Sequence, residues 1–377
     1  MAAELELKLL LVEDSVTDAA LIQANLRVGL ASVSIERSER LADALAAVRR
    51  TTFSAVLLDL NLPDSSGVGT FTRLAAECNG TPIVVLSGVD DTETAIQAVA
   101  AGAEDYVQKS HYDAQTLSRS VRFAIERRAR LTTETELLKV RTELKAAQVI
   151  QDTLYPRSAP IFPGMQIACG IRSAGTGCGD YYDFIPLNDG RQIIVVGDVS
   201  GHGMGSAIVM AETRASLQTL ADVGAAPNRM LATMNRLICA GASNGMFVTL
   251  LLVIYDPATQ SFEYFNAGHP GWVVSADDTV QLNTHQIPLG FAVDTEYVCG
   301  DCFTLSSGDI LLLPTDGIQE TIGANGLFGT NRLLETVRQL RQQSAQEIVD
   351  HLFDAAVRFS SRENLDDDMT AIVVKAL

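Results

Sequence analysis

The sequence is short of positive charge and of cysteine. Lysine and arginine number 28 against 46 aspartate and glutamate residues, which gives a formal net charge of −18. A field of this sign repels nucleic-acid phosphates and anionic membranes, so we expect neither nucleic acid nor membrane among the partners. The six cysteines are scattered along 377 residues, unlike the disulfide framework of a small secreted protein.

Long hydrophobic runs are also missing. No stretch of about 18 uncharged apolar residues occurs, and the first residues lack the basic segment and apolar core of a secretion signal. We therefore expect a soluble, cytoplasmic protein. Cys299 and Cys302 form a single CxxC pair without a second pair or a histidine cluster, and we interpret them as ordinary thiols rather than as a zinc or redox site.

Short apolar runs alternate with amphipathic stretches in the first third of the chain, which is the pattern of βαβ units around a parallel sheet. Reactive side chains end four of these runs, namely Glu13 with Asp14, Asp59, Ser87 and Lys109. Because ligands bind at the carboxyl ends of strands in open α/β sheets, we expect these side chains to meet in one crevice. Three carboxylates suit one Mg²⁺, and an aspartate beside the ion can accept a phosphoryl group. Any one of them could simply close a strand, but the complementary set favours a site.

Residues 1–122 resemble the receiver domain of two-component response regulators, a doubly wound α/β fold with a parallel five-stranded sheet. The resemblance rests on Glu13-Asp14, on Asp59 within LLDLNLPDSSG, on Ser87 and on Lys109 at the end of DYVQK. It implies that a sensor histidine kinase or a phosphotransfer protein phosphorylates Asp59, beside a Mg²⁺ held by Glu13, Asp14 and Asp59.

Two further positions of this segment bear on the resemblance. Tyr106 occupies the place of the family's reorienting aromatic residue. Ser110 follows the lysine where the family usually has proline. This departure leaves open the direction in which the Lys109 side chain points, but it does not affect the assignment of Asp59 as the phosphoacceptor.

Residues 114–154 contain neither proline nor glycine, and their pattern predicts one helix longer than the globular average. Its apolar residues form a partial seam, Leu117, Val121, Ala124 and Leu131, and a second seam, Leu137, Val140, Leu144, Ala147 and Leu154. The three- and four-residue spacing of the second seam is typical of a two-stranded coiled coil and predicts a parallel homodimer. The alternative is a single amphipathic helix lying on its own domain.

Beyond Pro163 the pattern changes to long β runs joined by turns, with two helical stretches in the middle and two near the end. It predicts an α+β sandwich, with one hairpin turning at residues 256–260. Aspartates lie at or near the ends of several of the predicted strands: Asp180, Asp183, Asp198, Asp316 and the triplet Asp366, Asp367 and Asp368.

Ionised carboxylates gather in one place only when cations neutralise them, and carboxylate-rich sites suit Mg²⁺ or Mn²⁺. Two such ions about 3.5 to 4 Å apart can activate a water molecule and neutralise a phosphate under attack. Any single Asp-Gly pair could be an ordinary turn. The whole arrangement predicts hydrolysis of a phosphate ester.

The same residues carry a resemblance, over residues 154–377, to the metal-dependent protein phosphatase (PPM) family in its bacterial sporulation and stress-response branch. The motifs, in the family's order, are GDYYDF, GDVSGHGMGSA, AGHP, PLGF, TDGIQE and DDDMT. The resemblance implies an αββα-type sandwich and a Ser/Thr protein phosphatase with two Mg²⁺ or Mn²⁺ ions. The implied metal ligands and catalytic residues are Asp180, Asp198, Asp316 and Asp367, with the carbonyl of Val199 as a further ligand. Asp368 is the alternative to Asp367.

Three other side chains have open roles. Arg172 could contact the substrate phosphate, since a guanidinium matches its geometry, or could be an ordinary strand-end arginine. His202 could donate a proton to the leaving oxygen or shape its loop. His269 is interpreted as structural.

Together these patterns predict a receiver domain over residues 1–122, a helical coiled-coil linker over 123–154 and a phosphatase domain over 155–377. The resemblance implies a response regulator that dephosphorylates a STAS-type anti-sigma-factor antagonist in a partner-switching pathway. The rival interpretations are a non-enzymatic adaptor with a pseudo-phosphatase domain and a hydrolase of small phosphate esters. The full acidic set argues for the enzyme. The direction of control by Asp59 stays open.

Overall fold

The chain divides into two compact units, residues 1–140 and 141–377, and the division falls within helix α5 (Ala114–Asp152). The computed structural model describes residues 6–88, 92–110, 113–241, 245–283, 286–324, 326–362 and 365–377. Within these ranges no helix is both long and apolar enough to cross a membrane.

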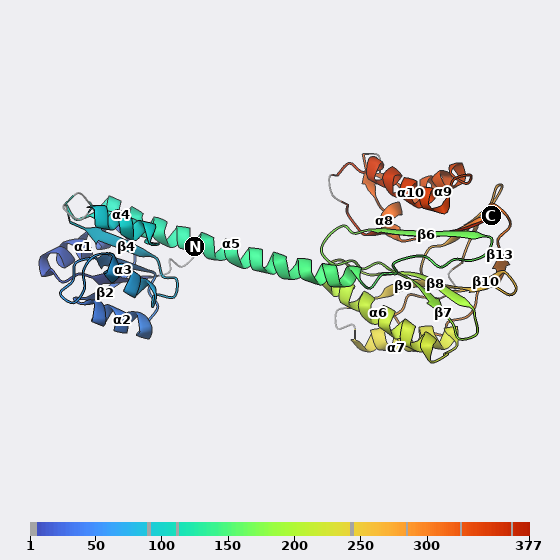
Figure 1. Ribbon diagram of the computed structural model, residues 1–377, viewed down its shortest axis with the longest axis horizontal. Helices are drawn as coiled ribbons and strands as arrows, with labels where there is room; N and C mark the ends of the chain where they lie inside the picture. Colours follow the sequence, from blue (N-terminus) through green and yellow to red (C-terminus); the bar gives the residue numbers. More distant parts are fainter. Residues whose placement is uncertain are drawn as a thin grey trace. The chain divides into compact units, whose positions relative to one another are not determined.

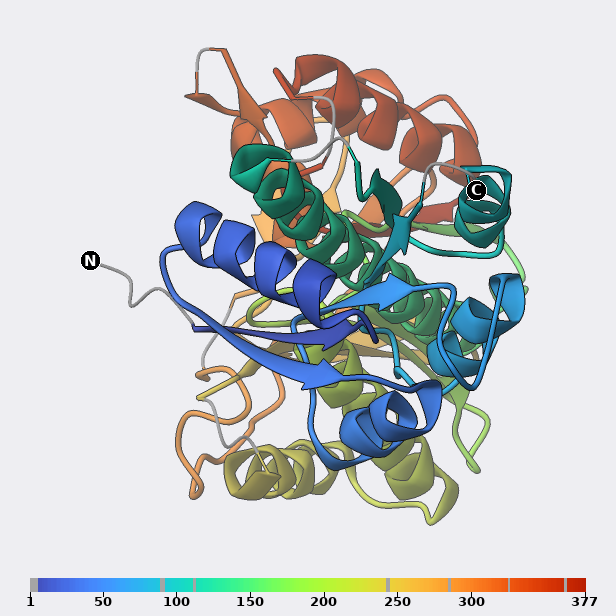
Figure 2. The same ribbon diagram turned by 90° about the vertical axis from the view of Figure 1, so that its left-hand side faces the viewer.

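The first unit is built on a parallel sheet of five strands in the order β2-β1-β3-β4-β5. The strands are β1 (Leu7–Val12), β2 (Val33–Ser38), β3 (Ala55–Asp59), β4 (Ile83–Ser87) and β5 (Asp105–Gln108). The helices are α1 (Val16–Gly29), α2 (Leu41–Arg50), α3 (Val68–Ala75), α4 (Thr92–Ala100) and the start of α5. Helices α1 and α5 pack on one face of the sheet and α2, α3 and α4 on the other (Figures 1 and 2). Every residue of β3 and β4 is therefore buried, and the predicted doubly wound fold is confirmed.

Helix α5 was expected to carry two seams, and the structure assigns parts of them to domain cores. Leu117, Val121 and Ala124 are buried against the receiver sheet. Leu154 lies beyond the end of α5 and packs on the core of the second unit. These residues are not free to join a coiled coil. Leu137 and Val140 are 54% and 52% exposed, so the middle of the helix has exposed apolar side chains. Dimerisation through these side chains remains a prediction.

The second unit contains two antiparallel five-stranded sheets, in the orders β13-β10-β9-β8-β7 and β12-β11-β14-β17-β6. The first sheet consists of β7 (Tyr181–Pro186), β8 (Gln192–Val199), β9 (Val248–Asp256), β10 (Ser261–Ala267) and β13 (Phe303–Thr304). The second consists of β6 (Met165–Arg172), β11 (Trp272–Val274), β12 (Thr279–Gln281), β14 (Ile310–Pro314) and β17 (Met369–Ala376). A short ribbon of β15 (Ile322–Gly323) and β16 (Gly326–Leu327) is separate.

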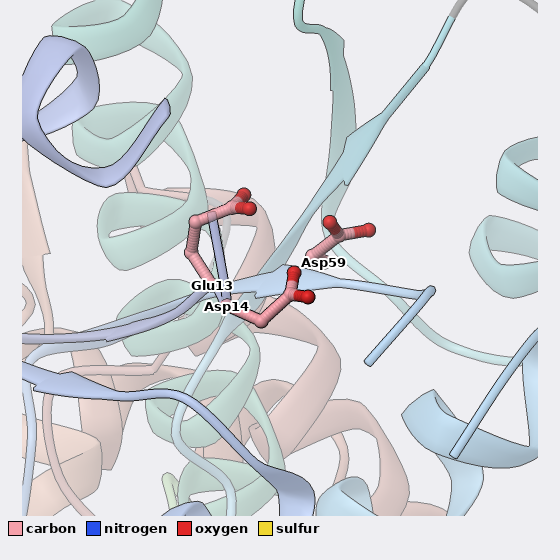
Figure 3. A group of neighbouring side chains, drawn as sticks. All are labelled: Glu13, Asp14 and Asp59. Carbon is pink, nitrogen blue, oxygen red and sulfur yellow. The ribbon is translucent and has the colours of Figure 1, made fainter. Parts of the chain in front are cut away.

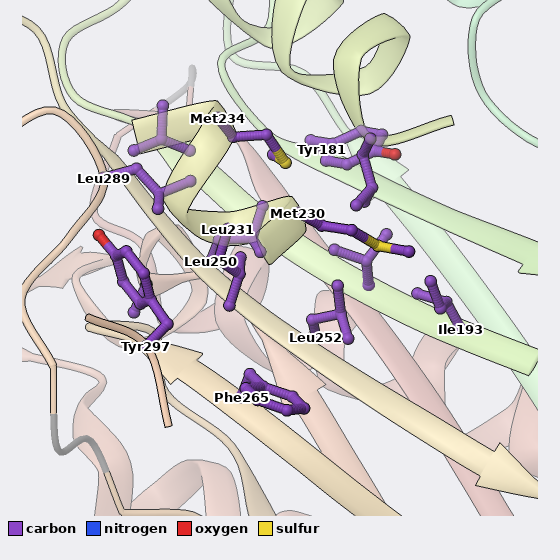
Figure 4. Close-up of a cluster of buried hydrophobic side chains, with 14 of the residues drawn as sticks. Tyr181, Ile193, Met230, Leu231, Met234, Leu250, Leu252, Phe265, Leu289 and Tyr297 are labelled. Carbon is purple, nitrogen blue, oxygen red and sulfur yellow. The ribbon is translucent and has the colours of Figure 1, made fainter. Parts of the chain in front are cut away.

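Helices cover the outer faces of both sheets, which confirms the α+β sandwich (Figure 1). Helices α6 (Met204–Asp222) and α7 (Pro227–Gly241) pack on the first sheet, through the cluster that includes Met230, Leu231 and Met234 (Figure 4). Helices α8 (Asp316–Gln319), α9 (Gly329–Gln339) and α10 (Ala345–Phe359) pack on the second sheet.

Both faces of the central strands are buried, since one faces helices and the other faces the opposite sheet. In β8, Ile193 and Val195 point to the helices, whereas Ile194 and Val196 point between the sheets. This explains the unbroken apolar runs of the sequence. The predicted hairpin joins β9 to β10, and Asp256 pairs with Ser261 at its turn.

Candidate functional site

Three carboxylates meet at the carboxyl edge of the receiver sheet. Glu13 and Asp14 follow β1 and Asp59 ends β3, and one oxygen of each lies within 4.8 Å of the others (Figure 3). Among the described residues this is the only group of three or more acidic, histidine or cysteine side chains gathered so closely. Oxygen ligands alone are the donor set that a hard divalent cation takes, so the residues fit Mg²⁺.

Lys109 reaches the same point from the end of β5. Its Nζ lies 2.5 Å from Oδ2 of Asp59 and 2.6 Å from Oε2 of Glu13. The backbone N–H of Lys109 donates to the carbonyl of Ser87 at 2.8 Å, which keeps the ends of β4 and β5 together. The lysine is therefore aimed at Asp59, although Ser110 stands where the family has proline.

Burial and charge shape the titration of this group. Burial raises the pKa of Glu13, against the lowering effect of Lys109. Burial also lowers the pKa of Lys109, but its hydrogen bonds to Asp59 and Glu13 outweigh that effect and leave the pKa raised. The hydroxyl of Ser87 is buried with no hydrogen-bond partner in the described part of the chain. Tyr106 is a half-buried residue of β5 and packs on the face of the sheet that α2, α3 and α4 cover. The predicted acids, Ser87 and Lys109 thus lie at the carboxyl ends of β1, β3, β4 and β5, whereas Tyr106 lies within β5.

A second set of acids lies on strand ends of the sandwich. Asp180 precedes β7 and Asp198 is near the end of β8, its antiparallel neighbour. Asp316 follows β14 and Asp367 precedes β17, which is again its antiparallel neighbour. Antiparallel pairing places the start of one strand beside the end of the next, so each sheet contributes two neighbouring acids. Val199, whose carbonyl is the fifth predicted ligand, ends β8.

These acids act on one another electrostatically. Burial, and after it the charges of Asp316 and Asp367, raise the pKa of Asp198 to about 7. Burial and then Asp198 raise the pKa of Asp180, which is almost fully buried. Burial is also the main cause of the raised pKa of Asp316 and of Asp367. A set of neighbouring carboxylates that disfavour one another's ionisation is the donor set that divalent cations stabilise.

The structure separates the roles of the neighbouring acids Asp367 and Asp368. Asp368 is buried, and its Oδ1 accepts hydrogen bonds from Ser173 Oγ at 3.0 Å and from the N–H of Ala174 at 2.8 Å. Its Oδ2 accepts from the N–H of Gly179 at 3.0 Å. Both oxygens of Asp368 therefore hold a loop, whereas Asp367 is exposed. Exposure at the site favours Asp367 as the metal ligand.

A cavity of about 320 Å³ opens at Asp367 and Asp368. Its lining consists of Ala174, Gly175, Thr176, Gly177, His202, Gly203, Leu365, Asp366, Asp367 and Asp368. Arg172 is not among these residues. Its guanidinium lies 2.9 Å from Asp354 and over the ring of Phe353, so the structure does not bring it to the cavity.

The two histidines of the motifs have different surroundings. His202 lines the cavity and is exposed. His269 is buried, with Nδ1 2.8 Å from Oγ1 of Thr249 and Nε2 3.0 Å from the carbonyl oxygen of Pro314. Burial lowers the pKa of His269 to about 3, so the ring is neutral. Nε2 then donates to the carbonyl and Nδ1 accepts from the hydroxyl, which supports the structural interpretation.

Sequence reasoning missed three residues of this site. Glu320 raises the pKa of Asp198 and of Asp316, and its position four residues after Asp316 in TDGIQE could have indicated it. Thr315 donates from Oγ1 to Oδ2 of Asp180 at 2.8 Å. The side chain of Gln151 hydrogen-bonds the backbone of Cys178, two residues before Asp180. No sequence signal points to the last two.

Comparison with protein families agrees with both units. The model of the stage II sporulation protein E (SpoIIE) family matches residues 188–377, and the model of the response regulator receiver domain matches residues 9–122. The chain belongs to the SpoIIE family. Its first unit is a receiver domain.

Individual relatives show how far the likeness extends. The phosphoserine phosphatase RsbU of Bacillus subtilis is 29% identical over 240 residues, which are 63% of this chain and 71% of RsbU. The solved RsbU and RsbW domains of Rv1364c from Mycobacterium tuberculosis are 26% identical with a TM-score of 0.50, covering 58% of this chain and 61% of that one. The SiaA-PP2C domain of Pseudomonas aeruginosa is 20% identical with a TM-score of 0.56, covering 64% and 98%, and shares the fold.

Proposed function

We propose that this SpoIIE family member is a response regulator whose output is a metal-dependent Ser/Thr protein phosphatase. Its parts are the receiver domain over residues 1–122, a helical linker over 123–154 and the phosphatase domain over 155–377. The observation that carries the proposal is the electrostatic coupling of the strand-end acids of both sheets, of which Asp367 lines an open cavity.

Asp180, Asp198, Asp316 and Asp367, with the carbonyl of Val199, hold two Mg²⁺ or Mn²⁺ ions in this proposal. When bound, the ions supply an activated water molecule and positive charge for the phosphate. The chain's own contribution is to position the acids on paired strand ends and to leave the cavity wall open for a phosphorylated side chain. The hydroxyl of Thr315 orients the carboxylate of Asp180.

The substrate is a phosphoserine or phosphothreonine residue of a protein, of which a STAS-type anti-sigma-factor antagonist is the best candidate. RsbU, the relative aligned over 240 residues, is a phosphoserine phosphatase. Rv1364c carries an RsbU domain and an RsbW domain together. These relatives support a partner-switching pathway for this chain.

The receiver controls this output by phosphorylation. A sensor histidine kinase or a phosphotransfer protein donates the phosphoryl group to Asp59, beside a Mg²⁺ held by Glu13, Asp14 and Asp59. Ser87 and Lys109 then engage the phosphoryl oxygens, and Tyr106 is the residue that reorients. Two copies of the chain pair through the exposed face of α5.

The deciding experiment measures phosphate release from a phosphoserine protein as Mn²⁺ is added. Wild type is expected to be active, and Asp198→Ala is expected to abolish activity because a proposed metal ligand is lost. Asp222→Ala, an exposed acid at the end of α6, is the matched control and keeps wild-type activity. A folded wild-type protein without Mn²⁺-dependent activity would point to the adaptor instead of the enzyme.

A further inference from the structure

Gln151, the second-last residue of α5, is a buried polar side chain that is only 7% exposed. Its Nε2 donates to the carbonyl oxygen of Cys178 at 2.6 Å, and its Oε1 accepts from the N–H of Cys178 at 3.0 Å. One side-chain amide thus pairs with both polar groups of a single backbone residue, as a neighbouring strand would. A buried pair of this kind leaves unsatisfied groups when one partner is removed.

Cys178 lies in the loop of residues 173–180, two residues before the proposed ligand Asp180. Tyr155, just past α5, donates its hydroxyl to the carbonyl oxygen of Asp180 at 2.8 Å, and its ring stacks on Tyr182. The end of α5 and the short segment that follows it therefore hold the backbone that carries the Asp180 side chain. The acid Asp368 holds the same loop through its own hydrogen bonds.

The loop has little room to move without changing the metal site. A side chain at Gly179 would place its Cβ 3.0 Å from the carbonyl oxygen of Val199 and 3.4 Å from Oδ1 of Asp198. The loop backbone therefore lies directly against two other proposed ligands. Metal and catalytic sites need their ligands held to within about 0.5 Å by the surrounding residues.

We propose that Gln151 is a positioning residue, which sets the place of Asp180 relative to Asp198 and so the affinity of the phosphatase site for its divalent cations. The inference rests on the proposed function and adds a point of control to it. Because α5 is one helix from Ala114 to Asp152, rotation or fraying of its last turn withdraws Gln151 from Cys178. Phosphatase activity then depends on the state of the helix at limiting cation.

The test uses the full chain with Gln151→Leu, which keeps the volume of the side chain and removes both hydrogen bonds. Gln342→Leu is the matched control, since Gln342 is an exposed glutamine of the same unit beyond the end of α9. Calorimetric titration with Mn²⁺ alone measures binding, and phosphate release is measured across the same Mn²⁺ range. The receiver acids contribute equally in every variant, so the difference reports on the phosphatase site.

Gln151→Leu is expected to raise the Kd for Mn²⁺ about tenfold, equivalent to about 1.4 kcal/mol. At saturating Mn²⁺ its kcat is expected to return to within about twofold of wild type, because the acids themselves are intact. Gln342→Leu is expected to bind Mn²⁺ as wild type does. If Gln151→Leu only lowers the unfolding temperature and leaves the Kd for Mn²⁺ unchanged, its role is merely structural and the proposal is overturned.

Tyr155→Phe keeps the test decisive if Gln151→Leu does not fold. It removes one hydroxyl from the carbonyl of Asp180 and retains the ring stack on Tyr182. The loss of one hydrogen bond is expected to raise the Kd for Mn²⁺ about threefold to tenfold. An unchanged Kd means that holding the backbone around Asp180 does not set the cation affinity, which overturns the proposal. A wild-type protein that binds Mn²⁺ but releases no phosphate contradicts the proposed function instead. The Kd for Mn²⁺ of Gln151→Leu, compared with that of wild type, still tests the role of Gln151 in that case.

Discussion

Removing the carboxylate of Asp368 is predicted to destabilise the second unit, whereas removing the carboxylate of Asp367 is predicted to abolish phosphatase activity and leave stability nearly unchanged. Asp368→Ala breaks three hydrogen bonds to the loop of residues 173–179. A hydrogen bond to a charged group contributes about 1.5 to 3 kcal/mol, and bonds that share one loop are not additive. We expect the free energy of unfolding of the second unit to fall by about 3 to 5 kcal/mol.

Asp367→Ala removes an exposed acid whose charge raises the pKa of Asp198. The side chain accepts one hydrogen bond, from the N–H of its neighbour Asp368. Without divalent cation, its removal relieves repulsion, so the free energy of unfolding is expected to stay within about 1 kcal/mol of wild type. With Mn²⁺, phosphatase activity is expected to be lost, because a ligand is missing.

Trp272 makes these measurements specific to one unit. It is the single tryptophan of the sequence and is buried in β11 of the second unit. Its fluorescence during urea unfolding in EDTA therefore reports on the phosphatase domain alone. With a slope of about 2 to 3 kcal/mol per molar urea, Asp368→Ala should lower the midpoint by roughly 1 to 2.5 M. The reasoning is refuted if Asp367→Ala destabilises the unit as much as Asp368→Ala does, or if Asp368→Ala alone abolishes Mn²⁺ binding in a fully stable protein.

Three further predictions concern pH, the receiver and the helix. The pKa of Asp198 is about 7 in the folded protein and close to 4 in the unfolded chain. The folded state then binds more protons between those values, so in EDTA the free energy of unfolding falls as pH rises from 4 to 7, by at most about 1.4 kcal/mol per pH unit. Asp198→Asn should flatten this dependence, and an unchanged slope contradicts it. Asp59→Asn should prevent labelling by a small-molecule phosphodonor, read by phosphate-affinity electrophoresis, and retained labelling would place the phosphoacceptor elsewhere. Leu137→Glu with Val140→Glu should convert a dimer to a monomer in analytical ultracentrifugation, whereas a monomeric wild type rules out pairing through α5.

The fold could be predicted well from the sequence because its strands are buried on both faces. The runs of β3, β4 and β8 are apolar except near their ends, and the turns between strands are marked by polar residues. The seams of α5 were harder to interpret. Leu117 and Val121 have the same spacing whether they face a sheet or a second helix, and only the packing places them in the receiver core.

The candidate site was accessible from sequence where strand ends carry the chemistry. Asp198 and Asp316 could be predicted because each terminates an apolar run. Arg172 could not be assigned, because its ion-pair partner Asp354 lies 182 residues away on a helix that packs over β6. The contact of Gln151 with Cys178 was equally inaccessible, since a glutamine near a helix end is ordinarily solvated.

The sequence by itself determined the kinds of groups at the two sites and the strand ends that carry them, because apolar runs end where the chain leaves the core. Tertiary structure alone decided how chemically identical side chains are used. Asp367 and Asp368 have the same carboxylate and adjacent positions, yet loop N–H groups hold only Asp368 and leave Asp367 exposed at the cavity. That difference arises from the placement of hydrogen-bond donors in space, which residue type and spacing do not encode.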